Sequence, residues 1–170
     1  QSKADLIWHD IQNAYRTRKI LTGTLGGIEK TEAGNLIAVI YYKEFRAVIP
    51  ITEMMINLLQ DEAHDYGSLS LRQNKVLNNM LGCEIDFIIK GLDTKTRSIV
   101  ASRKEAMLKK RQIFYLDQDV SGQTKVYVDR IVQARVIAVA EKVVRTEIFG
   151  IETSIPARDL SFDWLGDARE

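Results

Sequence analysis

The chain has 170 residues, of which 45% are hydrophobic, 24 are basic and 23 are acidic, so its formal net charge is +1. This length and apolar content suit one medium-sized or two small globular domains with a buried core. The near-neutral charge excludes a general attraction to nucleic acid, so any anion-binding surface has to be a local patch.

The first eighteen residues predict an amphipathic helix that starts at Ser2 or Asp5. Its apolar side chains recur at helical spacing on one stripe, made of Leu6, Ile7, Ile11, Ala14 and Tyr15. Trp8 stands beside this stripe, and we expect it to pack against the domain that follows.

Residues 20–50 predict a three-stranded meander. Strand spacing from Ile20 to Leu25 gives the first strand, and the glycine pair that follows allows a bulge. The second strand runs from Leu36 to Tyr41, and the third follows a tight turn at residues 42–44. Pro50 has no N–H group to donate to a strand, so it should end the sheet.

Helical segments follow the meander. Thr52 is expected to cap a helix with Met54, Met55, Leu58 and Leu59 on its apolar side, which Gly67 and Ser68 should break. A second helix over residues 69–81 should stop at Gly82.

A hairpin comes next, with Ile85, Phe87 and Ile89 on one face of the fourth strand and residues 99–101 returning as the fifth. Ser102 should cap a linker helix over residues 103–116. Five short strands with helical segments between the third and fourth follow the order of an OB-type barrel. We therefore predict a mainly β fold with α: an N-terminal helix over residues 1–18, then a five-stranded OB barrel with linker helices over residues 19–116.

Residues 126–170 look like a partial second copy of the meander. A long strand is expected over residues 131–138, and further strands at 143–149 and 152–155 flank a turn at Gly150. The segments "IPITEM" at 49–54 and "IPARDL" at 155–160 match, as do "GGIEK" and "VAEKV". With no fourth or fifth strand, this copy would expose unpaired edges. We expect either a longer protein or a dimer or other partner that completes the sheet.

Two stretches carry a family resemblance: "TGTLGGIEK…GNLIAVIYYKEFRAVIPITEM" and "LGCEIDFIIKGLDTKTRSIVASRKEA". They resemble the S1 RNA-binding domain, the OB-fold repeat of bacterial ribosomal protein S1 and of several ribonucleases. The second stretch looks like the closing pattern of that family at Gly82, Asp93, Ser102 and Lys104, and residues 132–161 look like the N-terminal half of another S1-like repeat. The arrangement is also similar to S1-like proteins carried on phages and mobile elements of Gram-positive bacteria.

Three positions depart from what the resemblance implies for RNA-binding members. Leu36 stands where an aromatic residue is common, and Pro50 and Pro156 stand where a histidine is usual. Family members with proline at that position are often protein-docking repeats. Loss of an aromatic platform matters, because stacking contributes about 1–3 kcal/mol per base.

Two clusters form the candidate RNA surface. Aromatic and basic residues alternate at the tip of the first hairpin, where they could stack bases and neutralise phosphates, and these are Tyr41, Tyr42, Lys43, Phe45 and Arg46. Basic residues also follow the second hairpin and its helix: Lys90, Lys95, Arg97, Arg103 and Lys104. The alternatives are cross-strand aromatic packing for the first cluster and a solvated, lysine-guarded strand edge for the second.

Signals for catalysis are poor. His9 and His64 have no partner at metal-ligand spacing, and "DEAHD" at 61–65 lacks the phosphate loop that a helicase would need. Cys83 is the single cysteine, which excludes an internal disulfide, favours a reducing cytoplasm and suggests a buried residue at a strand start. No apolar run is long enough to cross a membrane.

The sequence thus predicts a non-enzymatic, cytoplasmic RNA-binding module without cofactor or metal. The partner would be single-stranded or structured RNA. The alternative is a protein-docking repeat that acts as a scaffold on the ribosome or in a phage or mobile-element assembly, without binding RNA.

Overall fold

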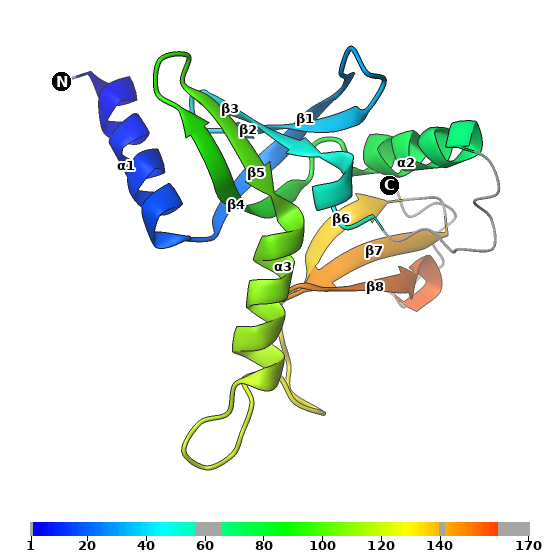
Figure 1. The fold of residues 1–170 in the computed structure, drawn as a ribbon. Helices are drawn as coiled ribbons and strands as arrows, with labels where there is room; N and C mark the ends of the chain where they lie inside the picture. Colours follow the sequence, from blue (N-terminus) through cyan, green and yellow to red (C-terminus); the bar gives the residue numbers. More distant parts are fainter. Residues whose placement is uncertain (1, 57–65, 140–141, 160–170) are drawn as a thin grey trace. The chain divides into compact units, whose positions relative to one another are not determined.

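The computed structural model describes residues 2–56, 66–139 and 142–159, and the chain divides into two compact units, Gln1–Glu105 and Ala106–Glu170. The first unit is mixed α/β and is built on five strands, whereas the second contains a sheet of three strands (Figure 1). Leu58, Leu59 and His64 lie outside the described residues.

The N-terminal helix α1 (Lys3–Thr17) begins at Ser2, as predicted. The hydroxyl of Ser2 accepts a hydrogen bond from the backbone N–H of Asp5 at 3.2 Å, and the Asp5 carboxylate accepts from the N–H of Ser2 at 3.4 Å, which forms a capping box. The buried stripe is narrower than predicted: Ile7, Trp8, Ile11 and Ala14 are buried, but Leu6 and Tyr15 are exposed.

The five strands of the first unit pair in a closed circuit, in the order β1-β2-β3-β5-β4 with β4 next to β1 (Figure 1). Their bounds are β1 Leu21–Lys30, β2 Leu36–Tyr42, β3 Phe45–Pro50, β4 Glu84–Asp93 and β5 Ser98–Ser102. All the pairings are antiparallel except that of β3 with β5, which is parallel. The circuit contains the five strands that the sequence predicts, in the same chain order.

Alternation of side chains explains this closed sheet. Alternate residues are buried in the first half of β1, in β2 and in β3, and this inner set comprises Leu21, Leu25, Leu36, Ala38, Ile40, Ala47 and Ile49. Val39 of β2 is buried as well, on the other face of the strand. In β4 five consecutive residues from Ile85 to Ile89 are buried, because neighbouring elements cover its outer face as well. The predicted bulge is present in β1, where the register shifts between Leu25 and Gly27.

The segment between β3 and β4 differs from prediction. A short 3₁₀ helix, η1 (Ile51–Glu53), follows Pro50, and no side chain caps it, so the predicted cap at Thr52 is wrong. Helix α2 (Tyr66–Met80) contains Gly67 and Ser68, so these residues do not break a helix. They lie in its first turn, where a poor helix former interrupts no internal bond. The predicted stop is confirmed at Gly82, whose φ is +84°.

Helix α3 (Arg103–Arg111) continues from the last residue of β5. The hydroxyl of Ser102 accepts a hydrogen bond from the N–H of Glu105 at 3.0 Å, so the predicted cap is confirmed. A π-helical turn, η3 (Gln112–Leu116), extends the helix to the end predicted from the sequence.

The second unit contains β6 (Arg135–Val139), β7 (Val143–Ile148) and β8 (Ile151–Pro156), paired antiparallel in that order. The predicted long strand from residue 131 is wrong, because β6 begins only at Arg135 and Ile131 is 97% exposed. An alternating apolar pattern does not make a strand where no neighbour pairs with the backbone.

The two meanders share one backbone register. Tyr42 pairs with Phe45 as Ile148 pairs with Ile151, and the strand-ending prolines pair with Ile37 and Val143. The first strand of each meander has a register shift at the same place, between Leu25 and Gly27 in β1 and between Val136 and Ala138 in β6, and each proline precedes a 3₁₀ helix, η1 or η4 (Ala157–Asp159). The matched register supports the internal repeat, but it aligns Gly26 with Ile137, which corrects the predicted match of "GGIEK" with "VAEKV".

Gly23 lies where the first unit has no room for a side chain. A Cβ atom there would lie 2.7 Å from Cγ2 of Ile40 and 2.8 Å from the carbonyl oxygen of Tyr41. We expect Gly23→Ala to lower the free energy of unfolding by about 1–3 kcal/mol, because the clash involves backbone and a buried side chain. Urea denaturation measures this change. Gly91→Ala is the matched control, since no atom lies within 4 Å of a Cβ there, and an equal loss in both variants would contradict the expectation.

Candidate nucleic-acid interface

Tyr41 and Arg46 face each other on the outer surface of the β2–β3 pair. The Tyr41 side chain is 50% exposed, in contrast to its buried neighbour Ile40, and Arg46 is about half-exposed. One edge of the Tyr41 ring fills the space beside Gly26, where a Cβ would collide with its Cδ2 and Cε2 atoms. The glycine in β1 therefore lets the ring lie close to the sheet with part of its surface open to solvent.

Arg46 also contacts an acidic residue. Its Nη2 atom lies 2.6 Å from Oε2 of Glu29, and both side chains are about half-exposed. Exposed ion pairs of this kind contribute about 0–1 kcal/mol, so a phosphate could replace Glu29 at small cost. Tyr41, Arg46 and Glu29 together form what we call the outer platform.

Two further predicted residues, Tyr42 and Lys43, lie at the turn between β2 and β3. Tyr42 packs edge-on against Phe87, with ring centroids 6.0 Å apart, which is the aromatic packing given as the alternative for this cluster. Lys43 is exposed at the turn, and its Nζ atom lies 5.3 Å from the centroid of the Tyr42 ring. Lys43 therefore brings a positive charge to the end of the hairpin.

Helix α1 contacts the predicted residues Phe45 and Arg97. The ring centroids of Phe45 and Trp8 are 5.4 Å apart, and the Cζ atom of Arg97 lies 5.8 Å from the Trp8 ring. Arg97 Nη2 also donates to Asp5 Oδ1 at 2.6 Å. This hydrogen bond, with further bonds from Ser2, holds the pKa of Asp5 below its ordinary value.

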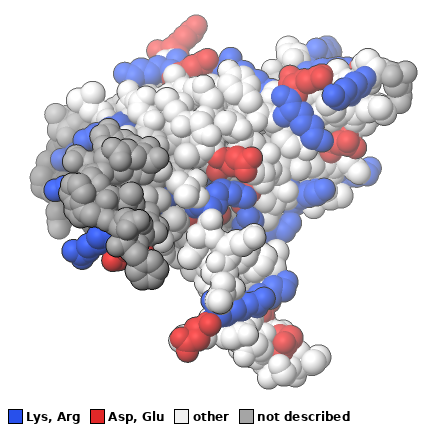
Figure 2. All heavy atoms as spheres, turned by 180° about the vertical axis from the view of Figure 1, so that it is seen from behind, with Lys and Arg blue, Asp and Glu red and all other residues white. Residues whose placement is uncertain are grey.

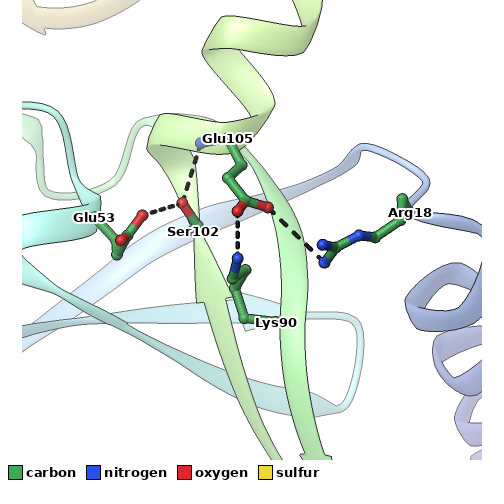
Figure 3. A network of polar contacts seen from close by, with 5 residues as sticks. All are labelled: Arg18, Glu53, Lys90, Ser102 and Glu105. Carbon is green, nitrogen blue, oxygen red and sulfur yellow. Dashed lines mark hydrogen bonds and ion pairs between the residues drawn. The ribbon is translucent and has the colours of Figure 1, made fainter.

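A polar network holds the predicted residue Lys90. Its ammonium pairs with Glu105, which also lies 3.9 Å from Arg18, while Ser102 donates to Glu53 at 2.5 Å (Figure 3). These five residues come from the end of α1, η1, β4, β5 and the first turn of α3, so the network ties the elements of the first unit together. Lys90 therefore has a structural partner.

The remaining basic residues of the second cluster fall into two groups. Arg103 is fully buried and donates from Nη1 to the carbonyl oxygen of Met54 at 2.9 Å, so the structure places it in the core rather than on the predicted surface. Lys95 and Lys104 are exposed. The loop that carries Lys95 is shaped by Asp93, whose Oδ1 accepts from the N–H of Lys95 at 2.9 Å.

The outer platform is not repeated in the second sheet. The shared register aligns Tyr41 with Glu147, which is buried, and Arg46 with Glu152, which pairs with Arg145. Figure 2 shows one face of the molecule, where Lys and Arg side chains lie among Asp and Glu side chains rather than in one continuous patch. This face therefore carries no continuous basic patch, in keeping with the near-neutral charge of the chain.

The expected packing of Trp8 against the following domain is confirmed by its contact with Phe45. Three other features of the site were not predicted: Gly26 beneath the Tyr41 ring, Glu29 beside Arg46, and the contact of Asp5 with Arg97. A detectable signal was the glycine at the bulge of β1, two residues beyond Thr24, which pairs with Tyr41. Leu36, read as a missing stacking residue, is only 4% exposed and belongs to the inner set. Leucine at this position therefore removes no ring from the outer face.

The described residues give little support for a metal site, a membrane-spanning helix or a reactive thiol. They contain no group of three or more His, Cys, Asp or Glu side chains that could hold a metal ion. Among the same residues, no helix has both the length and the apolar character needed to cross a bilayer. Burial raises the pKa of the half-buried Cys83 thiol, which disfavours the reactive thiolate.

No protein-family model matches the chain, and no curated protein matches it in sequence.

The Ser102 hydroxyl both caps α3 and donates to Glu53, so we expect Ser102→Ala to destabilise the first unit by about 1–2 kcal/mol. Chemical denaturation followed by circular dichroism measures the loss. Ser154→Ala, at an exposed position of β8, should change the unfolding free energy by less than about 0.5 kcal/mol. Equal stabilities of wild type and Ser102→Ala would show that the network has no stabilising effect.

The pKa of Asp5 should report directly on its contact with Arg97. We expect Arg97→Gln to raise this pKa towards its ordinary value, whereas Lys95→Gln should leave it unchanged. Because the folded-state pKa is lowered, the contact stabilises the protein above the unfolded-state pKa, and this contribution is lost as the pH falls through the folded-state value. NMR titration of the Asp5 carboxyl group provides the measurement, and an unshifted titration in Arg97→Gln would contradict the contact.

Proposed function

We propose that the first unit is an OB-type barrel of the S1 kind and binds single-stranded RNA on its outer platform, without sequence preference. The strand order supports the fold assignment, since a closed circuit β1-β2-β3-β5-β4 with helical segments between β3 and β4 is typical of OB barrels. Barrels of this type bind oligonucleotides on the face of their second and third strands. Tyr41 and Arg46 lie on that face.

The observation that carries the proposal is the juxtaposition of a half-exposed ring with a half-exposed guanidinium across one strand pair. A tyrosine ring stacks any base, because every base has a π-face, and this interaction contributes about 1–3 kcal/mol. Arg46 would bind the adjoining phosphate, and Lys43 and Lys95 add exposed positive charge at the ends of their hairpins.

A site with one ring and three cations should bind weakly. Each phosphate neutralised on a single strand contributes a slope of about −0.7 to the dependence of log K on log salt, so three contacts give a slope of about −2. RNA binding would accordingly be measurable at low salt and would decline at physiological salt.

A specific observation also favours the second candidate, a protein-docking scaffold. Three of the predicted basic residues are held by the protein itself, since Lys90 pairs with Glu105, Arg97 pairs with Asp5 and Arg103 is buried. Pro50 and Pro156 end their strands where the S1 resemblance implies a histidine. Absence of RNA binding at low salt would favour this scaffold.

Titration with poly-U at low salt tests the proposal. We expect Tyr41→Ala to weaken binding about 5- to 100-fold, which corresponds to the loss of one stacked base, and Tyr41→Phe to retain most of the affinity. Tyr127→Ala is the matched control, because Tyr127 is 49% exposed and lies in the second unit, and it should bind as wild type does. Equal binding by the Tyr41→Ala and Tyr127→Ala variants would refute the platform.

A further inference from the structure

The indole of Trp8 contacts two residues that could otherwise hold a base. On one side is the ring of Phe45, with centroids 5.4 Å apart and an interplanar angle of 39°. The other contact is with the guanidinium of Arg97, whose Cζ lies 5.8 Å from the indole ring. Unstacked RNA bases are bound in the same way, on aromatic rings and on the planes of arginine guanidinium groups.

The Asp5 carboxylate completes this arrangement. Its Oδ1 accepts from Arg97 Nη2 at 2.6 Å, so one arginine contacts both an aromatic ring and an anion. A nucleotide presents the same two groups, a planar base and a phosphate, and arginine recognises both. The pair of α1 side chains, an indole and a carboxylate one helical turn apart, therefore resembles a bound nucleotide in its chemistry.

The position of these residues connects them to the outer platform. Tyr42 and Phe45 are the strand pair next to Tyr41 and Arg46. Because side chains alternate along a strand, Phe45 points to the opposite side from Arg46, where α1 covers it. Arg97 comes from the loop that joins β4 to β5, and Figure 1 shows α1 beside that hairpin. A strand of RNA held on the platform would have to pass around the end of the β2–β3 hairpin to reach this place.

We propose that Phe45 and Arg97 form a second nucleotide subsite, for one unstacked base and its phosphate, and that α1 occupies it until RNA displaces Trp8 and Asp5. This inference rests on the proposed function, because it concerns the same RNA. The helix also buries Ile7, Ile11 and Ala14, so its displacement exposes apolar surface. Because exposing this surface costs free energy, we expect the subsite to fill only when a longer RNA is already held on the platform.

Fluorescence of Trp8 tests the displacement. The chain has two tryptophans, so in a full-length Trp164→Phe protein Trp8 is the sole emitter. Trp8 is 5% exposed, and acrylamide should quench it poorly in the free protein. With saturating poly-U at low salt we expect its quenching constant to rise at least threefold, whereas a uridine dinucleotide at the same occupancy should leave it unchanged.

The outcomes separate this inference from the proposed function. If poly-U binds and Trp8 stays shielded, the second subsite is refuted and the outer platform still stands. If poly-U does not bind at any salt concentration, both proposals fail together.

A charge reversal on α1 gives an independent readout. Asp5→Arg places a cation against Arg97 and should strengthen poly-U binding by several-fold more than Asp10→Arg does. The second variant makes the same charge change at an exposed position of the same helix, so it measures general attraction of the added charge. Adding Arg97→Gln to Asp5→Arg should abolish the extra gain, and circular dichroism verifies that the helix persists. Equal affinities of Asp5→Arg and Asp10→Arg would overturn the subsite.

Discussion

The fold of the first unit depends on a short parallel contact between β3 and β5, in which Ala47 pairs with Ile99 and Val48 with Val100. This contact joins the ends of the meander and the second hairpin, and thereby turns an open sheet into a closed circuit. Closure removes exposed strand edges and encloses one apolar interior. Only two residue pairs of β3 and β5 are in register. The hydrogen bonds of Ser102 with Glu53 and Glu105 therefore also help to hold the end of β5 in place.

The closed circuit also explains why so few of the candidate basic residues are available to a ligand. The end of β5 leads directly into α3, and at this junction Arg103 enters the core and Lys90 meets Glu105. The outer surface of β2 and β3 carries no comparable junction, which leaves Tyr41 and Arg46 exposed. Even at the junction the outcome differs between neighbours, since Arg103 is buried whereas Lys104 is exposed.

Local patterns in the sequence predicted the five strands of the first unit and the caps at Ser2 and Ser102, because these depend on neighbouring residues. The alternation through Ala38 and Ile40, the cap at Ser102 and the stop at Gly82 are of this kind. Contacts between distant segments could not be predicted, since the spacing of residues contains no information on which helix covers Phe45. The burial of Arg103 and the exposure of Ile131 were missed for the same reason: both depend on what packs nearby, not on residue type.

The two meanders share their backbone register but carry different side chains at the positions of the outer platform. Bulge, hairpin pairing and terminal proline coincide in both, yet an aromatic ring and a guanidinium in one are replaced by two carboxylates in the other. Side chains at these positions can therefore differ in both charge and burial, since Glu147 is buried and Glu152 pairs with Arg145, while the main chain keeps its path. One backbone pattern can thus present exposed side chains to solvent in one copy and enclose a partly buried polar pair in the other.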